Sequence, residues 1–432
     1  MATNGTAAVE LPVLIIGSGC CGLAMANGLT RAGIPCKVIE RASELRREND
    51  RDWGIACHWS APILADLMGP EKWSRIKTVQ CDPNMDTPDE DSLSVLNGAT
   101  GEVVNHLQFP KVYRFLRSRL RALLAEGIDV RFGKRLESLT YHENEDGNQK
   151  YATAHYADGT SERARLVVGA DGSNSTVRGH LVGAEAAKLK QLGLNAIFVN
   201  AAFPRERALY LRSFHPITSI IAHPDDMMSV LLLLDAPERD RPEGWRFTFY
   251  ISWRSEPEQQ EAEAAVMGVR ERLRQAKDKS QLYADPIRKA HEWLPEDHDQ
   301  VYWTRNMNWD PSLPEHAWDN HGGLVTLAGD AAHAMTYHRG QGLNHALDDA
   351  GKLVKLLTGS SGRSQSEVID IYETEMRARA GEEVRLSEMN SHMLHDWSQV
   401  KESPLMTRVL AKGSSDNLPA ATRGTPEVTN SS

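Results

Sequence analysis

The sequence predicts an α/β protein in which a Rossmann-like domain is interrupted by a mostly antiparallel β-sheet domain and is followed by C-terminal helices. Short apolar runs at 12–16, 166–170 and 324–327 each stand beside a glycine, which favours buried parallel strands. Between the second run and the third, apolar and polar residues alternate, which favours an antiparallel sheet. The alternating segments are 196–203, 218–222, 228–234 and 246–254.

The length of 432 residues exceeds that of one ordinary domain, so we expect two lobes that share a long interface. The chain would leave the Rossmann-like domain, form the sheet domain and then return. The predicted division places the first part of the Rossmann-like domain at 10–185, the sheet domain at 186–302, the second part at 303–360, the C-terminal helices at 361–411 and a disordered tail at 412–432.

Composition and charge restrict the class of function. Hydrophobic residues make up 41% and charged residues 25% of the chain, as in soluble globular proteins. The net charge of -10 argues against a nucleic-acid partner and favours a neutral or apolar small-molecule substrate.

No run approaches the ~18 apolar residues of a membrane span, and the polar start does not resemble a signal peptide. Because the cysteine count of 5 is odd and no spacing resembles a zinc site, we expect reduced thiols in a cytoplasmic protein. No oligomeric state is predicted.

The remaining elements follow from periodicity. Residues 23–31 have helical spacing and 37–40 form the next strand, so the first apolar run starts a strand–turn–helix–strand unit. Helical spacing also covers 112–126, and a strand follows at 129–132. Further helices are predicted at 257–276, 340–357 and 364–393, and a hairpin connection at 223–226.

A glycine-rich loop, GSGCCG at 17–22, separates the first strand from the first helix. Gly17 permits a tight turn, Gly19 allows the backbone to approach a pyrophosphate, and Gly22 allows close helix–strand packing. The helix N-terminus adds free N–H groups and partial positive charge. Glu40 lies 18 residues after Gly22, where its carboxylate can accept both hydroxyl groups of a ribose. The alternative is a tight turn without a ligand. Strand, helix and acid together favour a nucleotide, but they do not separate FAD from NAD.

A second motif, GADGSNSTVR at 169–178, follows a later strand. Asp171 and Gly172 would form a sharp turn there, with Ser175 capping a helix. Taken alone, this motif is best explained as a capped turn without a ligand.

A third motif combines LAGDAAH at 327–333 with RGQGLN at 339–344. The Asp330 carboxylate can accept hydrogen bonds from ribityl hydroxyl groups, and the adjacent glycine leaves room for them. Gly340 and Gly342 allow the backbone to touch a planar ring. The helix that begins at about Leu343 directs its positive end at that ring, where a reduced flavin holds negative charge.

The three motifs, in this order, resemble the group A flavoprotein monooxygenases, the para-hydroxybenzoate hydroxylase-like family. The resemblance covers most of 10–185 and 320–360, and the 339–344 run looks like fungal members that serve secondary metabolism. It implies an FAD-binding domain interrupted by a substrate-binding domain. In such enzymes an arginine begins the helix that leads into the third strand, and Arg117 fits that place best, with Arg114 as the alternative. The residues predicted to bind FAD are Gly17, Gly19, Gly22, Glu40, Arg41, Gly54, Arg117, Asp171, Asp330, Gly340, Gly342, Leu343 and Asn344.

The resemblance also implies a reaction. NAD(P)H reduces FAD, O2 adds at flavin C4a, and the hydroperoxide delivers one oxygen atom to the substrate. Asp171 and Arg178 match the family motif that is linked to FAD and NAD(P)H. The expected outcome is hydroxylation or epoxidation of an aromatic, indolic or polyene natural product. The alternatives are a flavin dehydrogenase or reductase without oxygen transfer, a halogenase (whose Trp-x-Trp-x-Ile-Pro element the sequence lacks) and a non-catalytic nucleotide sensor.

Three residues are candidates for catalysis or substrate binding. Many relatives have a proline where this chain has Tyr337, so we expect a bulky substrate that is held differently from a simple phenol. Arg212 and Tyr250 lie on proposed strands of the middle sheet, where each could donate a hydrogen bond to the substrate or to a developing oxyanion. A surface salt bridge for Arg212 and core packing for Tyr250 are the alternatives.

Two further features have open interpretations. The segment RDWGIACHW at 51–59, which contains Gly54, either lines the flavin and the substrate or plugs the domain interface with aromatic side chains. His333, His338 and His345 are expected to be structural or flavin-adjacent rather than metal ligands, because no carboxylate completes a site. No metal is predicted.

Overall fold

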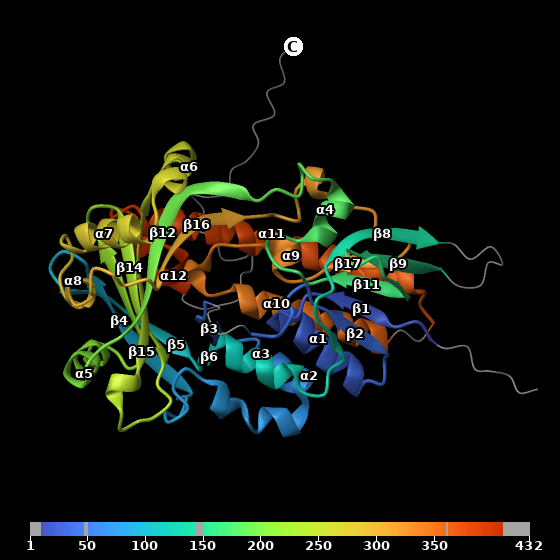
Figure 1. Cartoon of the computed structure of the whole chain (residues 1–432), viewed down its shortest axis with the longest axis horizontal. Coiled ribbons are helices and arrows are strands. Elements are labelled where there is room, and N and C mark those ends of the chain that lie inside the picture. Colours follow the sequence, from blue (N-terminus) through green and yellow to red (C-terminus); the bar gives the residue numbers. More distant parts are fainter. Residues whose placement is uncertain (1–9, 47–50, 143–149, 360–361, 409–432) are drawn as a thin grey trace, which may run out of the picture.

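The computed structural model describes residues 10–46, 51–142, 150–359 and 362–408. The tail predicted to be disordered, 412–432, lies outside the described residues. Two lobes lie side by side, with a parallel sheet and its helices on the right of Figure 1 and a large, mostly antiparallel sheet on the left. Within the described ranges, no helix is long and apolar enough to cross a membrane.

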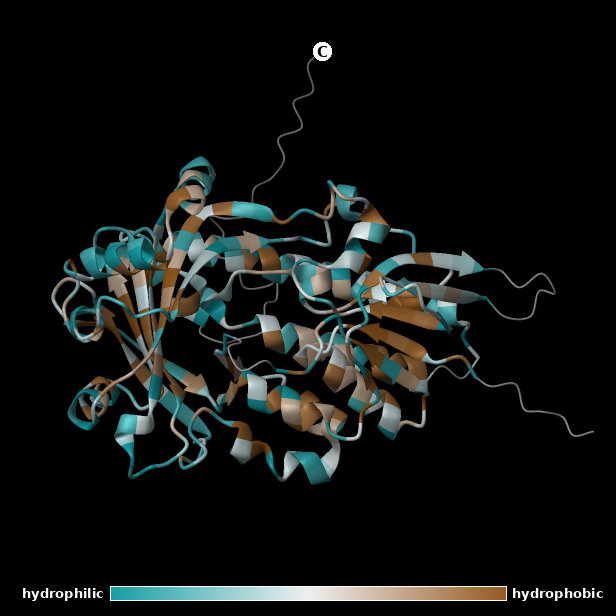
Figure 2. Ribbon diagram, viewed as in Figure 1, coloured by the Kyte–Doolittle hydropathy of each residue, from teal (hydrophilic) through white to brown (hydrophobic). Residues whose placement is uncertain are grey.

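The right-hand lobe is built on a five-stranded parallel sheet. The strand order is β17 (Val325–Leu327), β11 (Leu166–Gly169), β1 (Val13–Ile16), β2 (Cys36–Ile39) and β7 (Val130–Arg131). Every neighbouring pair is parallel. The three strands β17, β11 and β1 are buried along their whole length, which explains their unbroken apolar runs and their brown colour in Figure 2.

Helices cover one face of this sheet and a small second sheet covers the other (Figure 1). The helices are α1 (Cys20–Arg31), α2 (Ala61–Trp73), α3 (Arg117–Ala125) and α10 (Gly342–Thr358). The second sheet is antiparallel, with β8 (Leu136–His142), β9 (Tyr151–Tyr156) and β10 (Ser161–Ala164), and α4 (Thr176–Val182) packs beside it. A short antiparallel pair, β3 (Gly54–Cys57) with β6 (Tyr113–Leu116), lies between the lobes.

The left-hand lobe is built on a seven-stranded sheet. Its order is β16 (Val301–Asn308), β12 (Lys190–Ala202), β15 (Arg246–Arg254), β14 (Met227–Asp235), β13 (Thr218–His223), β4 (Glu90–Asn97) and β5 (Val103–Pro110). All pairs are antiparallel except β13 with β4. The sheet therefore extends beyond the predicted segment 186–302: it includes the hairpin at 90–110, and its strand β16 continues to residue 308.

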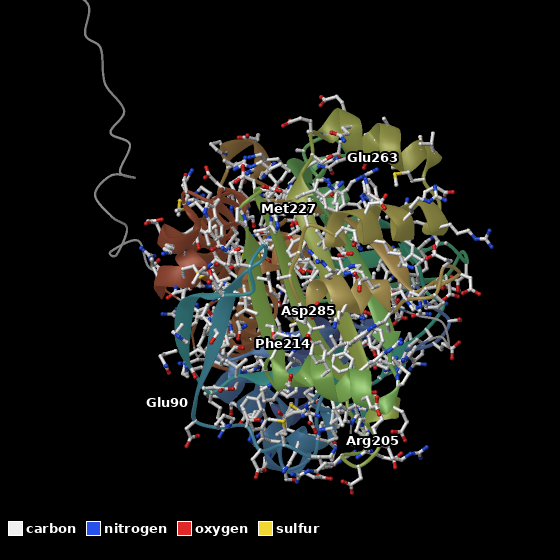
Figure 3. The ribbon with its side chains drawn as sticks, turned by 90° about the vertical axis from the view of Figure 1, so that its left-hand side faces the viewer. Glu90, Arg205, Phe214, Met227, Glu263 and Asp285 are labelled. Atoms are coloured by element: carbon white, nitrogen blue, oxygen red, sulfur yellow. The ribbon has the colours of Figure 1, made fainter. Side chains whose placement is uncertain are left out.

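The two faces of the seven-stranded sheet have different partners. On the outer face, α5 (Arg205–Ser213), α7 (Val269–Ser280) and α8 (Ile287–Glu292) pack on the side chains of Phe247, Phe249, Ile251 and Trp253. Figure 3 looks onto the lobe from this side, where Arg205 and Phe214 mark the two ends of α5. The alternate residues of β15, among them Thr248 and Tyr250, face the other lobe.

One long helix, α11 (Gln365–Leu394), connects the lobes. Its Tyr372 hydroxyl donates to Leu327 O of the parallel sheet (2.9 Å), and its Glu388 pairs with Lys190 of β12 (2.6 Å). The remaining short elements are α6 (Pro257–Val266), α9 (Asp330–His333), α12 (Pro404–Arg408) and the 3-10 helices η1 (Ile76–Val79), η2 (Pro242–Gly244), η3 (Pro314–His316), η4 (Tyr337–Arg339) and η5 (Val400–Glu402).

Most predicted elements are present, but three predictions were wrong. The predicted helical stretch 112–126 divides into β6 and α3, because residues 113–116 pair with β3. The predicted helix 257–276 is two helices, because Gly268 begins a second one by donating its N–H to Glu271 Oε2 (3.0 Å). Arg212 was placed on a strand, but it lies in the last turn of helix α5. The predicted hairpin connection at 223–226 is confirmed between β13 and β14.

Candidate flavin site

The three glycine motifs meet at the carboxyl ends of three adjacent strands, β1, β11 and β17. A Cβ atom at Gly17, in the first motif, would lie 2.4 Å from Ala170 O in the second. A Cβ atom at Gly329, in the third motif, would lie 3.2 Å from Cys21 Sγ in the first. The motifs therefore pack directly against one another, as a single ligand that touches all three requires.

The glycines of the first loop have different surroundings. Gly17 has a φ of 110°, and a Cβ atom at Gly22 would lie 2.3 Å from Gly17 O, so both positions are closed to side chains. At Gly19 the nearest atom to an added Cβ would be Ala170 O, 4.0 Å away. Gly19, at the N-terminus of α1, is thus the glycine of this loop that has space for another molecule against its backbone.

Glu40 is joined to the same loop. Its Oε2 accepts hydrogen bonds from Ser18 N (3.0 Å) and Ser18 Oγ (2.6 Å), and Arg121 Nε donates to Ser18 O (2.9 Å). Burial by itself raises the pKa of Glu40, but hydrogen bonds from Ala42 and Ser18 outweigh burial and hold that pKa below its usual value. The carboxylate is therefore ionised and half-buried at the end of β2, whereas the neighbouring Arg41 is exposed.

A small polar cavity of about 120 Å³ lies beside this loop. It is lined by Arg46, Arg51, Asp52, Arg117, Ser118 and Arg121. Arg117 begins α3, as predicted, and its guanidinium lies 4.4 Å from the ring centre of Trp53. Four guanidinium groups and a single carboxylate give the cavity a positive potential, which suits a pyrophosphate.

The second motif is a capped turn that a buried arginine fastens to the third motif. Asp171 accepts a hydrogen bond from Ser175 Oγ (2.5 Å), and Ser175 caps α4 by accepting from Arg178 N (2.9 Å). The Arg178 guanidinium donates to four backbone carbonyl groups, including Ala331 O at 3.0 Å. Burial lowers the pKa of Arg178 to about 10. The Asp171 carboxylate thus serves the turn, and Arg178 fixes the turn against α9.

In the third motif, Asp330 faces the large cavity between the lobes. No residue in the described ranges donates a hydrogen bond to its carboxylate, and burial raises its pKa. The backbone beneath it is held by Asp349, which accepts from Gly329 N (2.8 Å) and from His333 Nε2 (2.6 Å). Arg379 of α11 completes this buried set with a bond of 2.6 Å to Asp349. Asp330 is therefore positioned by its neighbours and is itself free to bind a ligand hydroxyl.

The loop at 339–344 brings backbone to the same cavity. Gly340 is left-handed, with a φ of 62°, and a Cβ atom at Gly342 would lie 4.0 Å from Asp330 Oδ1. The first N–H groups of α10, which begins at Gly342, have no acceptor within the helix. The side chain of Asn344 does not face the cavity: its Oδ1 accepts from His58 N (3.0 Å) and Ser60 Oγ (2.7 Å). The part of Asn344 that remains for FAD is its backbone N–H.

The main cavity has a volume of about 540 Å³ and lies between the two lobes. One wall consists of Asp330, the backbone at Gly340–Leu343 and the residues Trp53–Ala56. The opposite wall is the inner face of the seven-stranded sheet, with Phe198, Ile220, Met228, Val230 and Tyr250. The segment 51–59 thus lines the cavity over 51 and 53–56, whereas its aromatic residue Trp59 packs on His345 of α10, so each of its two interpretations describes part of it.

Two of the three catalytic candidates line this cavity. Tyr250 and Tyr337 have ring centres 5.6 Å apart, and each packs against Phe198, at 4.5 and 5.3 Å. The Tyr337 hydroxyl is buried beside the side chains of Asn306 and Ser252, without a hydrogen bond of standard geometry to either. Arg212, by contrast, does not line the cavity: it pairs with Asp82, which does, and lies 4.3 Å from the ring centre of Trp245. The salt-bridge alternative therefore describes Arg212.

His333 and His345 belong to one hydrogen-bond network, which runs through Asp349 and Arg379, whereas His338 belongs to another. His333 contacts Asp349, His338 Nδ1 lies 2.9 Å from Ser391 Oγ, and His345 Nδ1 accepts from Arg379 Nη1 at 2.9 Å. Across the described part of the chain, no three His, Cys, Asp or Glu side chains are arranged to hold a metal ion.

The residues present fit FAD. The open backbone at Gly19 and the arginine-lined cavity suit the pyrophosphate, the unbonded carboxylate of Asp330 suits a ribityl hydroxyl, and the cavity at Gly340–Leu343 suits a planar ring. Sequence reasoning included Arg51 in the candidate segment 51–59 but missed Arg46 and Arg121. The spacing contained one usable signal, since Arg121 is four residues after Arg117 and so lies on the same face of α3.

Comparisons with known proteins agree with this geometry. The family model described as "FAD binding domain" matches residues 10–57 and 88–387. The FAD-dependent monooxygenase cctM of Talaromyces islandicus is 33% identical, over 93% of this chain and 98% of its own length. The FAD-dependent monooxygenase phnB of Penicillium herquei is 35% identical, over 92% of this chain and 94% of its own.

A solved structure shares the fold. Klebsiella pneumoniae HpxO in complex with FAD and uric acid superposes with a TM-score of 0.70 at 20% identity, and the match covers 91% of each chain. The motifs, the site and the relatives lead to one conclusion: this chain belongs to the FAD-binding-domain family and is an FAD-dependent monooxygenase.

Proposed function

We propose that this enzyme takes electrons from NAD(P)H and inserts one oxygen atom of O2 into an aromatic, indolic or polyene natural product, by hydroxylation or epoxidation. The observation that carries the proposal is a single cavity that joins the flavin-binding backbone at Gly340–Leu343 to an aromatic wall formed by Phe198, Tyr250 and Tyr337. Bound FAD supplies the redox and oxygen chemistry.

The chain's own residues bind the substrate, orient it against the flavin and exclude water from the cavity. Aromatic rings offer flat surfaces at low entropic cost, so Phe198 and Tyr337 are suited to hold a planar substrate against the flavin. The cavity wall also includes Leu405 of α12, which covers the sheet from the C-terminal side. A volume of about 540 Å³ shared by ring and substrate favours a molecule larger than a simple phenol.

The test is an oxygen-incorporation assay. FAD-loaded protein is incubated with NADPH or NADH, isotopically heavy O2 and panels of polycyclic aromatic, indolic and polyene compounds, and products are analysed by mass spectrometry. The expected result is a product heavier by one labelled oxygen atom, formed only with reductant. Reductant-dependent formation of peroxide with every compound and without any labelled product would overturn the proposal in favour of a dehydrogenase or reductase.

A further inference from the structure

Arg114 is an arginine of the cavity wall that has no acidic partner among the described residues. Arg114 lies on β6, opposite Ala56 of β3. Its Nη2 donates to Gly54 O (3.1 Å), and its Nε has no hydrogen-bond partner. Within the described ranges, no carboxylate lies at ion-pair distance from this guanidinium, although Arg114 lines the cavity.

The charge of Arg114 is not offset by its neighbours. Burial lowers the pKa of Arg114, and the titratable groups that oppose this effect are the Cys81 thiol and the Tyr250 phenol. Burial raises the pKa of Cys81 to about 12 and raises that of Tyr250 well above its usual value, so both groups are neutral near pH 7. A buried positive charge without a counter-charge is unfavourable. The cavity is the place from which a negative charge can reach it.

Other arginines of this region have partners. Arg119 pairs with Asp235 (2.9 Å), and Arg212 pairs with Asp82. Arg51, the second cavity arginine without an acidic partner, lies 4.6 Å from the ring centre of Tyr302 and 5.0 Å from that of Phe198. These rings partly compensate its charge. Arg114 therefore stands out as the cation of the cavity that nothing in the described protein compensates.

The surroundings of Arg114 suit an aromatic anion. The hydroxyl of Tyr250 is bonded to no described residue, and because this phenol is neutral it is available as a hydrogen-bond donor. The Tyr250 ring packs at 4.5 Å from Phe198, which continues the aromatic wall away from the arginine. A ligand with an acidic oxygen on a flat aromatic body would meet a cation at one end and aromatic rings along its length.

We propose that Arg114 binds an anionic oxygen of the substrate, with Tyr250 as a second hydrogen-bond donor. The substrate class is then an aromatic compound with a carboxylate or an ionised enol or phenol oxygen. The inference rests on the proposed function, since it treats the cavity as the substrate site. A planar guanidinium donates two parallel hydrogen bonds to such oxygens, which fixes the aromatic body in one orientation relative to the flavin ring.

The experiment measures binding with a matched pair of probes. FAD-loaded protein is titrated with 2-naphthoate and with its neutral analogue 2-naphthamide, and the change in flavin absorbance reports the Kd of each. The wild-type protein is expected to prefer naphthoate. In Arg114→Gln, the Kd for naphthoate should rise by about tenfold or more, whereas that for naphthamide should change by less than about twofold.

Three controls make the result specific. Arg246→Gln removes the same charge from a residue of β15 that is paired with Asp235, and it should leave both Kd values unchanged. Retained naphthamide affinity shows that the Arg114 variant is folded. If Arg114→Gln fails to retain FAD, the titrations are repeated with Arg114→Lys. This variant keeps the positive charge but loses the planar pair of donors, so it should weaken the binding of naphthoate and leave that of naphthamide unchanged.

Two results would overturn the inference. The first is an equal loss for both probes, or no loss for naphthoate. The second is an unchanged naphthoate Kd together with a lower flavin reduction potential in Arg114→Gln, which would make reduced flavin the counter-charge. Neither measurement depends on turnover, so the oxygen-incorporation assay can fail or succeed independently.

Discussion

Gly17 and Gly19 are two positions apart in one loop, but they differ in what surrounds them. A Cβ atom at Gly17 would collide with Ala170 O at 2.4 Å, whereas one at Gly19 would have 4.0 Å of space. We therefore expect Gly17→Ala to prevent folding of the parallel lobe. Gly19→Ala should fold with a melting temperature close to that of the wild-type apoprotein.

The surroundings of Gly19 also predict an effect of its substitution on cofactor binding. If FAD pyrophosphate approaches the backbone at Gly19, the methyl group of Gly19→Ala should raise the Kd for FAD by about tenfold or more. The measurement is flavin fluorescence quenching, with thermal unfolding of the apoprotein as the control for folding. Wild-type FAD affinity in Gly19→Ala would contradict the assignment of this glycine to the cofactor.

At the residue scale, the sequence predicted the parts of the site that depend on local structure. The motif glycines and Asp330 follow from strand ends and turns, and the structure brings them together. Arg114 was considered only as an alternative to Arg117, because nothing in the sequence shows that its charge lacks a partner. The overall charge of -10 favoured a neutral or apolar substrate. Net charge averages over the whole surface, and so it does not describe one buried guanidinium.

At the scale of elements, Asn344 joins two segments that both face the cavity. Its side-chain amide bonds Ala56 O (3.2 Å), His58 N (3.0 Å) and Ser60 Oγ (2.7 Å), which ties the segment after β3 to the start of α10. Asn344→Ala removes these bonds and leaves buried groups unpaired. We expect a loss of about 2–4 kcal/mol in the free energy of unfolding.

The effect of Asn344→Ala on FAD binding can be measured separately from this loss of stability. The loosened segments should release FAD faster, while Asp330 and the first loop remain intact. Stopped-flow fluorescence of FAD dissociation, performed well below the melting temperature of the variant, measures this. Ser364→Ala is a suitable comparison, because it removes the N-cap of α11, worth about 1 kcal/mol, at a residue outside the three flavin motifs. Equal dissociation rates for the two variants would contradict the role of Asn344 as a tie.

Element boundaries were predicted well where periodicity was long and poorly where tertiary pairing decided them. Helices α10 and α11 were placed within two residues of the observed ends, since their apolar faces repeat over many turns. The division between β6 and α3 was missed, because it depends on pairing with β3 across 60 residues of sequence. The break between α6 and α7 depends on a single capping bond to Gly268 N.

At the scale of the whole molecule, burial of neutral histidines makes stability depend on pH. Burial is the main cause that lowers the pKa of His58, His291 and His395 to about 4. The ordinary value in an unfolded chain is about 6.5. Between these values the unfolded chain binds protons that the folded chain does not, so stability falls as the pH falls. Each histidine contributes a slope that approaches about 1.4 kcal/mol per pH unit.

The measurement is urea unfolding at several values between about pH 7 and pH 5. His291 lies against Phe249 on the outer face of the sheet, far from the flavin motifs in sequence, and its Nδ1 bonds Ile287 O (2.9 Å). In His291→Gln, the slope of the free energy of unfolding against pH should decrease by the contribution of one histidine, even if the free energy of unfolding is itself lower. An unchanged slope would contradict the prediction.

The mixed origin of the seven-stranded sheet has a consequence for biosynthesis. The hairpin β4–β5 leaves the ribosome as residues 90–110, but its sheet neighbour β13 is translated only at 218–223. At typical elongation rates the nascent hairpin waits on the order of ten seconds for this partner. During that interval Leu93, Val95 and Leu107, which the finished protein buries, have no sheet to pack on. The emerging chain is therefore expected to engage a chaperone at this stage of translation.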